Sequence, residues 1–280
     1  MKNLFFAFLF ITAQAFACPY GYDLKEPVNI PVGVTEGGID EAQFMKIAGE
    51  LEELYTPDVA AHGGKLKIYK EWASTTVNAY AQREGKEWKV ILLGGIARHK
   101  FMTADGFALI VCHEIGHHLG GVPRYDGIDI GWATNEGQSD YYSTMKCLRR
   151  YWENADNAAA LRELEIPAKL TEECGKNWLW NKDEALCIRS GMAGFSASYV
   201  FAALAWNLKK PKFETPDSKV VKETYGAHPK AQCRLDTYFQ GSLCEASPLE
   251  EMRTETQGAC HESLGHKSGM RPTCWFKPTL

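Results

Sequence analysis

The sequence lacks a long apolar segment, a cluster of positive charge and a Cys-x-x-Cys pair. No stretch of about 18 consecutive apolar residues occurs, so we expect no transmembrane helix. The formal net charge is −4 and there is no basic run, which gives no support for nucleic acid or an anionic membrane as a partner. Without Cys-x-x-Cys, we expect neither a cysteine-ligated zinc nor a thioredoxin-like redox site. Repeats and low-complexity segments are also missing.

Residues 1–17 have the pattern of a signal peptide. Lys2 supplies the positive start, Leu4–Ala13 is apolar, and Ala15–Ala17 forms a small-x-small cleavage site before Cys18. We therefore expect a periplasmic or secreted protein. A lipid anchor on Cys18 is the alternative, which the bulky residue before Ala17 and the lack of an upstream leucine disfavour.

Nine cysteines in an exported chain indicate disulfide bonds, and the odd number leaves at least one cysteine without an internal partner. Cys112 is our candidate for that one, because a thiol in the middle of an apolar helix behaves as a small buried hydrophobe. In the C-terminal tail, Cys233, Cys244, Cys260 and Cys274 should all be oxidised. Cys233–Cys244 and Cys260–Cys274 are the simplest local pairs, although the sequence alone leaves the connectivity open.

The most informative stretch is His113-Glu114-Ile115-Gly116-His117, inside the apolar run Phe107–Gly121. On an α-helix, His113 and His117 lie one turn apart on the same face, where two neutral imidazoles can bind one Zn²⁺. Glu114 can reach a water molecule at such a metal and take its proton as the water attacks a carbonyl. The alternative is a core helix that carries these histidines by chance.

A catalytic zinc needs a third protein ligand. The extended pattern HExxHxxGxxH is excluded, because Pro123 occupies the position of its third histidine. Glu136 is our candidate, and Asp140, one helical turn later, could accept the free N–H of a zinc-bound histidine. A solvated acidic helix start is the alternative. His118 points about 100° away from His117 on the helix, so we place it beside the site or on the surface, without a catalytic role.

Alternation of apolar and polar residues predicts strands over Leu66–Trp72, Thr76–Gln82 and Trp88–Ile96, the last two forming a hairpin. The turn-rich loop Gly121–Gly131 would overhang the metal. Thr103 or Asp105 is expected to cap the His113 helix, and Asp40 to cap an earlier one. Helices are further expected over Asn157–Glu165, Lys182–Met192 and Ser196–Leu208.

Four pieces of the sequence together resemble a known family. HExxH followed by Glu-x-x-x-Asp is similar to the gluzincin metallopeptidases. Val77–Ala81 and the apolar Val90–Ile96 are similar to two strands of the CAAX-prenyl and membrane-stress peptidases and of their soluble periplasmic relatives. His228-Pro229, with Arg234 nearby, is similar to the His-Pro motif and arginine of the same family. The order of the pieces also matches.

The resemblance implies a zincin-like α+β fold, with a small mixed sheet whose antiparallel edge strand lies over the HExxH helix, and an added helical layer. Asn78 and Ala79 would lie on that edge and bind an extended substrate through main-chain hydrogen bonds; a purely structural hairpin is the alternative. His228 would donate to the carbonyl oxygen as it gains negative charge, or else be a surface turn residue. Arg234 would pair with a carboxylate near the site, such as Asp140.

We therefore expect an exported endopeptidase with one Zn²⁺ per chain, acting on extended or unfolded protein. Residues 18–280 would form one domain, with a helical insertion over about 155–220 and a disulfide-bonded tail that also carries surface histidines. One alternative is a non-proteolytic zinc-binding chaperone or binding module of the cell envelope. Another is a metal-free, disulfide-rich surface protein. The presence of Glu114 favours catalysis.

Overall fold

The structure is a computed structural model that describes residues 28–33, 37–127, 129–179, 181–205 and 209–278. The predicted signal peptide and Cys18 lie outside the described residues. The elements, in chain order, are α1 (Glu41–Ala61), β1 (Lys65–Glu71), β2 (Ala79–Glu84), β3 (Glu87–Leu93), α2 (Gly94–Ala97), α3 (Ala104–Leu119), α4 (Glu136–Tyr142), the π-helical turn η1 (Ser143–Cys147), α5 (Leu148–Tyr151), α6 (Asn157–Leu161), α7 (Ala168–Asn177), α8 (Asn181–Leu204), α9 (Ala231–Leu243) and the 3₁₀ turn η2 (Glu262–Leu264).

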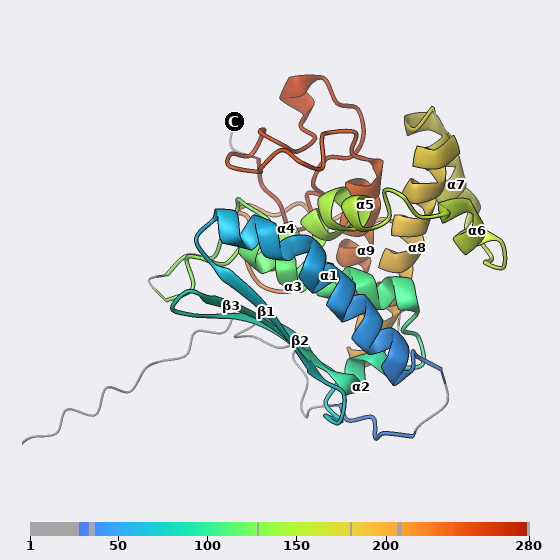
Figure 1. Cartoon of the computed structure of the whole chain (residues 1–280). Coiled ribbons are helices and arrows are strands. Elements are labelled where there is room, and N and C mark those ends of the chain that lie inside the picture. Colours follow the sequence, from blue (N-terminus) through green and yellow to red (C-terminus); the bar gives the residue numbers. More distant parts are fainter. Residues whose placement is uncertain (1–27, 34–36, 128, 180, 206–208, 279–280) are drawn as a thin grey trace, which may run out of the picture.

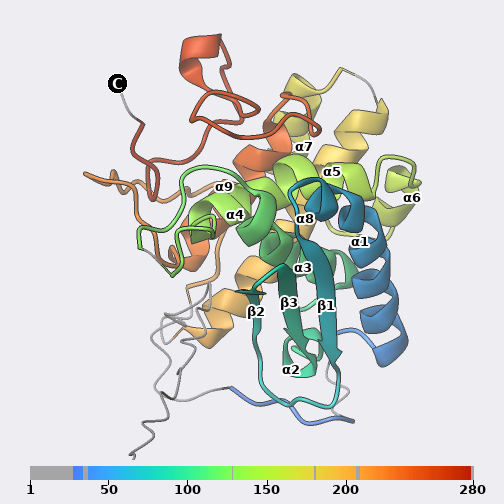
Figure 2. The same cartoon turned by 60° about the vertical axis from the view of Figure 1, so that its left-hand side comes forward.

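The three strands form one mixed sheet in the order β1-β3-β2 (Figure 2). β1 runs parallel to β3, and β2 runs antiparallel to β3, with Ala79 opposite Leu92 and Glu84 opposite Glu87. The predicted hairpin is therefore confirmed. Among the described residues β2 pairs with a strand on one side only, which makes it an edge strand of a mixed α+β fold.

Strand β2 begins later than predicted. The residues before it bond with the segment near Val28, since the amide of Val77 donates to the carbonyl of Val28 at 2.9 Å. The register with β3 starts at Ala79, opposite Leu92, and the Asn78 carbonyl accepts the amide of Leu93 at 3.2 Å. The amide of Ala79 donates to the side-chain oxygen of Asn78 at 2.9 Å. Asn78 and Ala79 thus lie at the start of the edge strand, where the sequence analysis placed them.

Helix α3 runs through the centre of the molecule, and all residues from Gly106 to His118 are buried. α1 and α3 pack against each other and the sheet, α8 packs against α3, and α9 packs against α8 (Figure 1). This position explains why the helix is apolar on nearly every side. Thr103 is its N-cap and accepts the amide of Gly106 at 3.0 Å, whereas Asp105 pairs with Arg189 at 2.8 Å.

The helical layer after α5 has different bounds from those expected. The helices expected over Lys182–Met192 and Ser196–Leu208 are one continuous helix, α8, as far as Leu204; residues 206–208 lie outside the described part. Gly194 lies in the expected gap and continues the helix. A side chain there would meet Tyr238 of α9 at 2.5 Å, so glycine allows the two helices to approach closely.

Four disulfides hold the helices and the tail together: Cys112–Cys147, Cys174–Cys187, Cys233–Cys274 and Cys244–Cys260. The tail cysteines are all oxidised, as predicted, but the two local pairs are wrong. The tail folds back along α9, which brings Cys274 to Cys233 at a Cα–Cα distance of 6.0 Å. These disulfides fit a protein of an oxidising, extracellular or periplasmic compartment.

The prediction that Cys112 is a free buried thiol is also wrong. Cys112 of α3 is bonded to Cys147 of η1, with their Cα atoms 5.6 Å apart. The bridge ties the helix that carries the two histidines to the helical stretch that begins at Glu136. The ninth cysteine, Cys18, lies outside the described residues. None of the helices in the described part is long and apolar enough to cross a membrane.

Candidate metal centre

Two helices bring the three expected ligands together. α3 presents His113 and His117, α4 begins with Glu136, and one donor atom from each lies within 4.8 Å of the others in a buried position. His113 Nε2 lies 3.1 Å from Glu136 Oε2, and His117 Nε2 lies 3.7 Å from Glu136 Oε1. Donors bound tetrahedrally at about 2.0–2.2 Å lie roughly 3–4 Å apart, so the group fits one metal ion.

The close approach of α3 and α4 depends on Gly116, inside the HExxH motif. A Cβ atom there would lie 3.2 Å from the Ser139 backbone, closer than side chains normally pack. The start of α4 is fixed by Asn135, whose side chain accepts the amide of Gln138 at 3.0 Å. Glu136 is therefore the first helical residue and faces α3.

Each histidine of the group has an oxygen atom close to its other ring nitrogen. His113 Nδ1 lies 2.8 Å from Asp140 Oδ1, and His117 Nδ1 lies 2.7 Å from the carbonyl oxygen of Thr134. A carbonyl only accepts, so Nδ1 of His117 carries the proton and Nε2 presents its lone pair towards Glu136. Asp140 thus lies where the sequence analysis placed it, beside a candidate ligand.

Helix α9 positions Asp140. Arg234 donates from Nε to Oδ2 at 2.8 Å and from Nη2 to Oδ1 at 2.6 Å, which is the pairing expected from the sequence. Tyr238, one turn further along α9, also donates to Oδ1 at 2.6 Å. The sequence analysis missed Tyr238, although its spacing of four residues from Arg234 places both on one helix face.

Burial dominates the electrostatics of the site. It raises the pKa of Glu114 to about 7 and lowers the pKa of His117 to about 4. Burial also disfavours the charged form of His113, but Asp140 and Glu136 outweigh it and raise the pKa of His113 to about 10. The carboxyl groups of Glu114, Glu136 and Asp140 are buried close together, and this arrangement favours a positive charge between them.

Glu114 has a carboxylate oxygen that packing does not explain. Its Oε2 is buried, has no hydrogen-bond partner among the described residues, and lies 3.9 Å from His117 Nε2. Leaving a buried carboxylate oxygen without a partner costs free energy. A group in this condition beside a metal-binding set is available to interact with a substrate or with water.

His228 also lies at the site. Its Nε2 is 3.2 Å from Glu136 Oε2, and its side chain is 13% exposed. The loop that carries it is tied to α4, because the Gly226 carbonyl accepts the amide of Glu136 at 3.3 Å. The alternative of a surface turn residue is therefore wrong, whereas the role of His228 as a donor to the substrate stays a prediction.

Tyr125 is a site residue that the sequence analysis missed. Its hydroxyl donates to Glu136 Oε1 at 2.7 Å, and its ring stacks on His117 with the ring centroids 6.5 Å apart. Its amide also donates to the carbonyl of Ala133 at 2.9 Å, which holds the loop in place. The only signal in the sequence is that Tyr125 belongs to the turn-rich loop Gly121–Gly131 expected to overhang the metal.

Replacing Tyr125 by Phe should weaken Zn²⁺ binding by about 10- to 100-fold, since Glu136 loses a donor that orients its carboxylate. Competition with a chromophoric chelator measures the affinity. Tyr225→Phe is the matched control, because Tyr225 is 42% exposed and, among the described residues, makes no hydrogen bond or ring contact with the three ligands. Equal affinities in the two variants would show that the Tyr125 hydroxyl does not act on the ligand.

His118 is buried, so its placement on the surface is excluded. Its Nε2 lies 3.0 Å from the Lys89 carbonyl, and its ring stacks between Trp88 and Trp132 at centroid distances of 5.4 and 5.1 Å. Burial lowers its pKa to about 3, so the ring is neutral. His118 joins the end of α3 to strand β3.

Comparisons of this chain with known protein families, with curated proteins and with solved structures found no match. The fold and the site define a mixed α+β protein with a buried His-His-Glu group that could bind a metal ion. Any narrower class depends on the chemistry of that group and on the resemblance of its motifs.

Proposed function

We propose that this protein is a zinc-dependent endopeptidase of the zincin type that hydrolyses extended or unfolded proteins outside the cytoplasm. The observation that carries the proposal is the buried, unpartnered Oε2 of Glu114 next to the His113–His117–Glu136 group. A site that served only to stabilise the fold would not need this carboxylate. The gluzincin resemblance of the four sequence pieces supports the same function.

The donor set supports zinc as the metal. Two imidazoles and one carboxylate, with a further position left for water or substrate, are typical of catalytic zinc. When bound, Zn²⁺ would polarise the substrate carbonyl and make a water molecule more acidic. Glu114 would accept the proton of the attacking water and pass it to the leaving amine. Asp140 and Arg234 would hold His113 in the orientation that binding requires.

The edge strand supports an extended substrate. In the part of the chain that the structure describes, β2 pairs with a strand only through β3, and main-chain groups at such a sheet edge can pair with a peptide, which selects extended chains without reading much of their sequence. Ala81 of β2 packs in one small cluster with Ala133, Tyr125 and Trp132. Because Tyr125 also contacts Glu136, this edge lies beside the metal group.

The test combines metal content with proteolysis. Purified protein should contain about one zinc per chain, cleave a reduced, unfolded protein, lose this activity on dialysis against a chelator and regain it with Zn²⁺. Bound zinc without cleavage would indicate the binding-module alternative. Absence of zinc binding would instead leave the disulfide-rich surface protein.

His228→Ala should lower turnover at least about tenfold with little change in KM or zinc content. A donor aimed at the developing oxyanion acts mainly in the transition state, and such donors are worth about 10²–10³ in rate. His266→Ala, in the tail, is the control. Unchanged turnover would remove His228 from catalysis, and loss of zinc would make it a ligand.

A further inference from the structure

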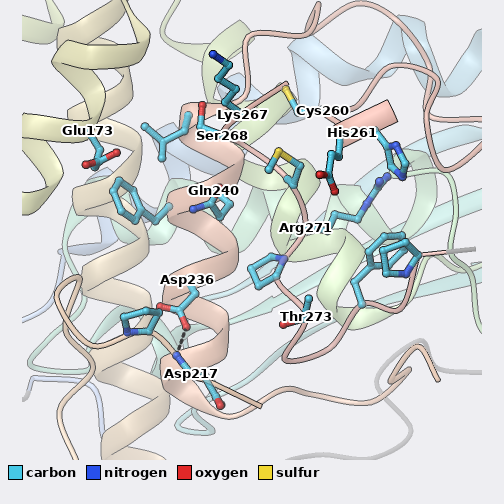
Figure 3. Close-up of a pocket in the computed structure, with 18 of the residues that line it drawn as sticks. Glu173, Asp217, Asp236, Gln240, Cys260, His261, Lys267, Ser268, Arg271 and Thr273 are labelled. Atoms are coloured by element: carbon cyan, nitrogen blue, oxygen red, sulfur yellow. Dashed lines mark hydrogen bonds between the residues drawn. The ribbon is translucent and has the colours of Figure 1, made fainter. Parts of the chain in front are cut away.

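A cavity of about 1100 Å³ lies between α7, α9, residues 213–217 and the C-terminal tail (Figure 3). None of the metal-site residues lines it. Its size suits a ligand larger than a few atoms, since binding cavities for small molecules are typically about 300–1000 Å³. Much of its wall is apolar, formed by Phe213, Pro216, Phe239, Leu243, Met270, Pro272 and Phe276.

Disulfides fix the walls of this cavity. Cys174–Cys187 joins α7 to α8, and two further bridges, Cys233–Cys274 and Cys244–Cys260, tie the tail to α9 and its end. A cavity whose walls are joined covalently is formed before a ligand arrives, which lowers the entropy cost of binding.

Asp236 of α9 lines the cavity as a buried carboxylate without a cation. It is 8% exposed and accepts a hydrogen bond from the amide of Asp217 at 2.7 Å (Figure 3). It also accepts a hydrogen bond from Gln232 Nε2 at 2.8 Å. Burial raises its pKa to about 6, so it is ionised at neutral pH. No cation of the described residues pairs with it, whereas buried charges in proteins are normally paired.

The other charged groups of the wall do not neutralise Asp236. Lys169 pairs with Glu173 at 2.9 Å, and Arg271 donates to Gln138 and to a backbone carbonyl. Lys267 lies at the end of the cavity opposite Asp236 in Figure 3. Three further carboxylates line the cavity without an ion pair to any described residue: Glu214, Asp217 and Glu262.

We propose that this cavity binds an organic cation with an apolar body, its ammonium group against Asp236 and its body against the phenylalanines. The ammonium would supply the positive charge that pairs with the buried Asp236 carboxylate. The aromatic rings can contact both the apolar body of the ligand and a nearby cation. This binding site goes beyond the proposed peptidase and does not depend on it.

The test uses two fluorescent probes that share a body and differ in charge. Dansylcadaverine ends in a primary amine, and dansyl-aminocaproate ends in a carboxylate. At neutral pH the wild-type protein should bind the amine at least about tenfold more tightly, because only the amine gains a charged hydrogen bond to Asp236. Equal affinities, or binding of neither probe, would overturn the proposal. The comparison of the two probes uses only the wild-type protein, so it does not depend on whether a variant folds.

Variants locate the binding. Asp236→Asn should weaken amine binding at least about tenfold, whereas binding of the carboxylate probe should not weaken, because a repelling charge is removed. Glu214→Gln, which alters an exposed side chain, should weaken amine binding by about two- to threefold. Glu153→Gln, exposed and outside the cavity, should change neither. Amine binding that is as tight in both cavity variants as in wild type would place the binding site elsewhere. Zinc content, measured in parallel, should be the same in all variants.

Discussion

Replacing Glu114 by Gln should reduce peptide hydrolysis by about 10²–10⁴-fold while zinc stays bound, because glutamine keeps the shape of the side chain but cannot accept a proton. The three candidate ligands His113, His117 and Glu136 are unchanged by this substitution. Steady-state cleavage of an unfolded protein and zinc content of the same preparation give the two readouts. The loss should appear in kcat, since the proton moves only as the water attacks.

A measurement of thermal stability distinguishes loss of the proton acceptor from misfolding of the Glu114→Gln variant. Oε2 of Glu114 has no hydrogen-bond partner among the described residues, so replacing the carboxylate by glutamine breaks no hydrogen bond at that atom and should not destabilise the folded state. The thermal unfolding temperature of Glu114→Gln should therefore remain close to that of wild type. Glu153→Gln is the control for a glutamate outside the site. Near-normal hydrolysis by zinc-loaded Glu114→Gln would mean that another group accepts the proton.

Glu136→Ala should lower zinc affinity by more than about 100-fold, because changes to groups that only support a ligand already cost about 10–100-fold. Removal of the carboxylate leaves two protein ligands, His113 and His117, and takes from Tyr125 the acceptor of its hydroxyl. Equilibrium competition with a chelator measures the affinity, and hydrolysis should fall with zinc occupancy.

Asp140→Asn tests whether loss of a residue that only supports a ligand lowers zinc affinity less than loss of a ligand. Asp140 lies 2.8 Å from His113 and would not bind the metal itself, so the affinity should fall by about 10- to 100-fold and less than in Glu136→Ala. The reverse order would contradict the assignment of the ligands. Unchanged, tight zinc binding by Glu136→Ala would place the third ligand elsewhere, and His228, with Nε2 3.2 Å from Glu136 Oε2, is one candidate.

Much of the site could be predicted because its signals are local. Helix geometry fixes that residues four apart share a face, so the motif alone predicts that His113 and His117 point together. The same spacing predicts that Asp140 accompanies Glu136. The hairpin of β2 and β3 and the caps Asp40 and Thr103 are also decided within a few residues of chain.

The errors concern contacts between distant segments. Cys112 was expected to be a free thiol because its neighbours are apolar, yet η1 carries Cys147 to within bonding distance. The connectivity of the tail cysteines was left open, with local pairs as the simplest choice, whereas the tail returns along α9. Tyr125 and Tyr238 were missed because nothing next to them in the sequence indicates the carboxylates that they contact.

The sequence by itself therefore predicted the residues of the candidate metal group, the hairpin and the presence of disulfides, because periodicity and residue chemistry express these within one or two elements. Only the tertiary structure decided the disulfide pairing, the contacts of Tyr125 and Tyr238, and the cavity beside Asp236. Such features arise where separate helices and loops pack, as Tyr238 and Asp140 do across 98 residues of chain. Packing of this kind depends on the whole core at once, so it cannot be predicted from a local sequence pattern.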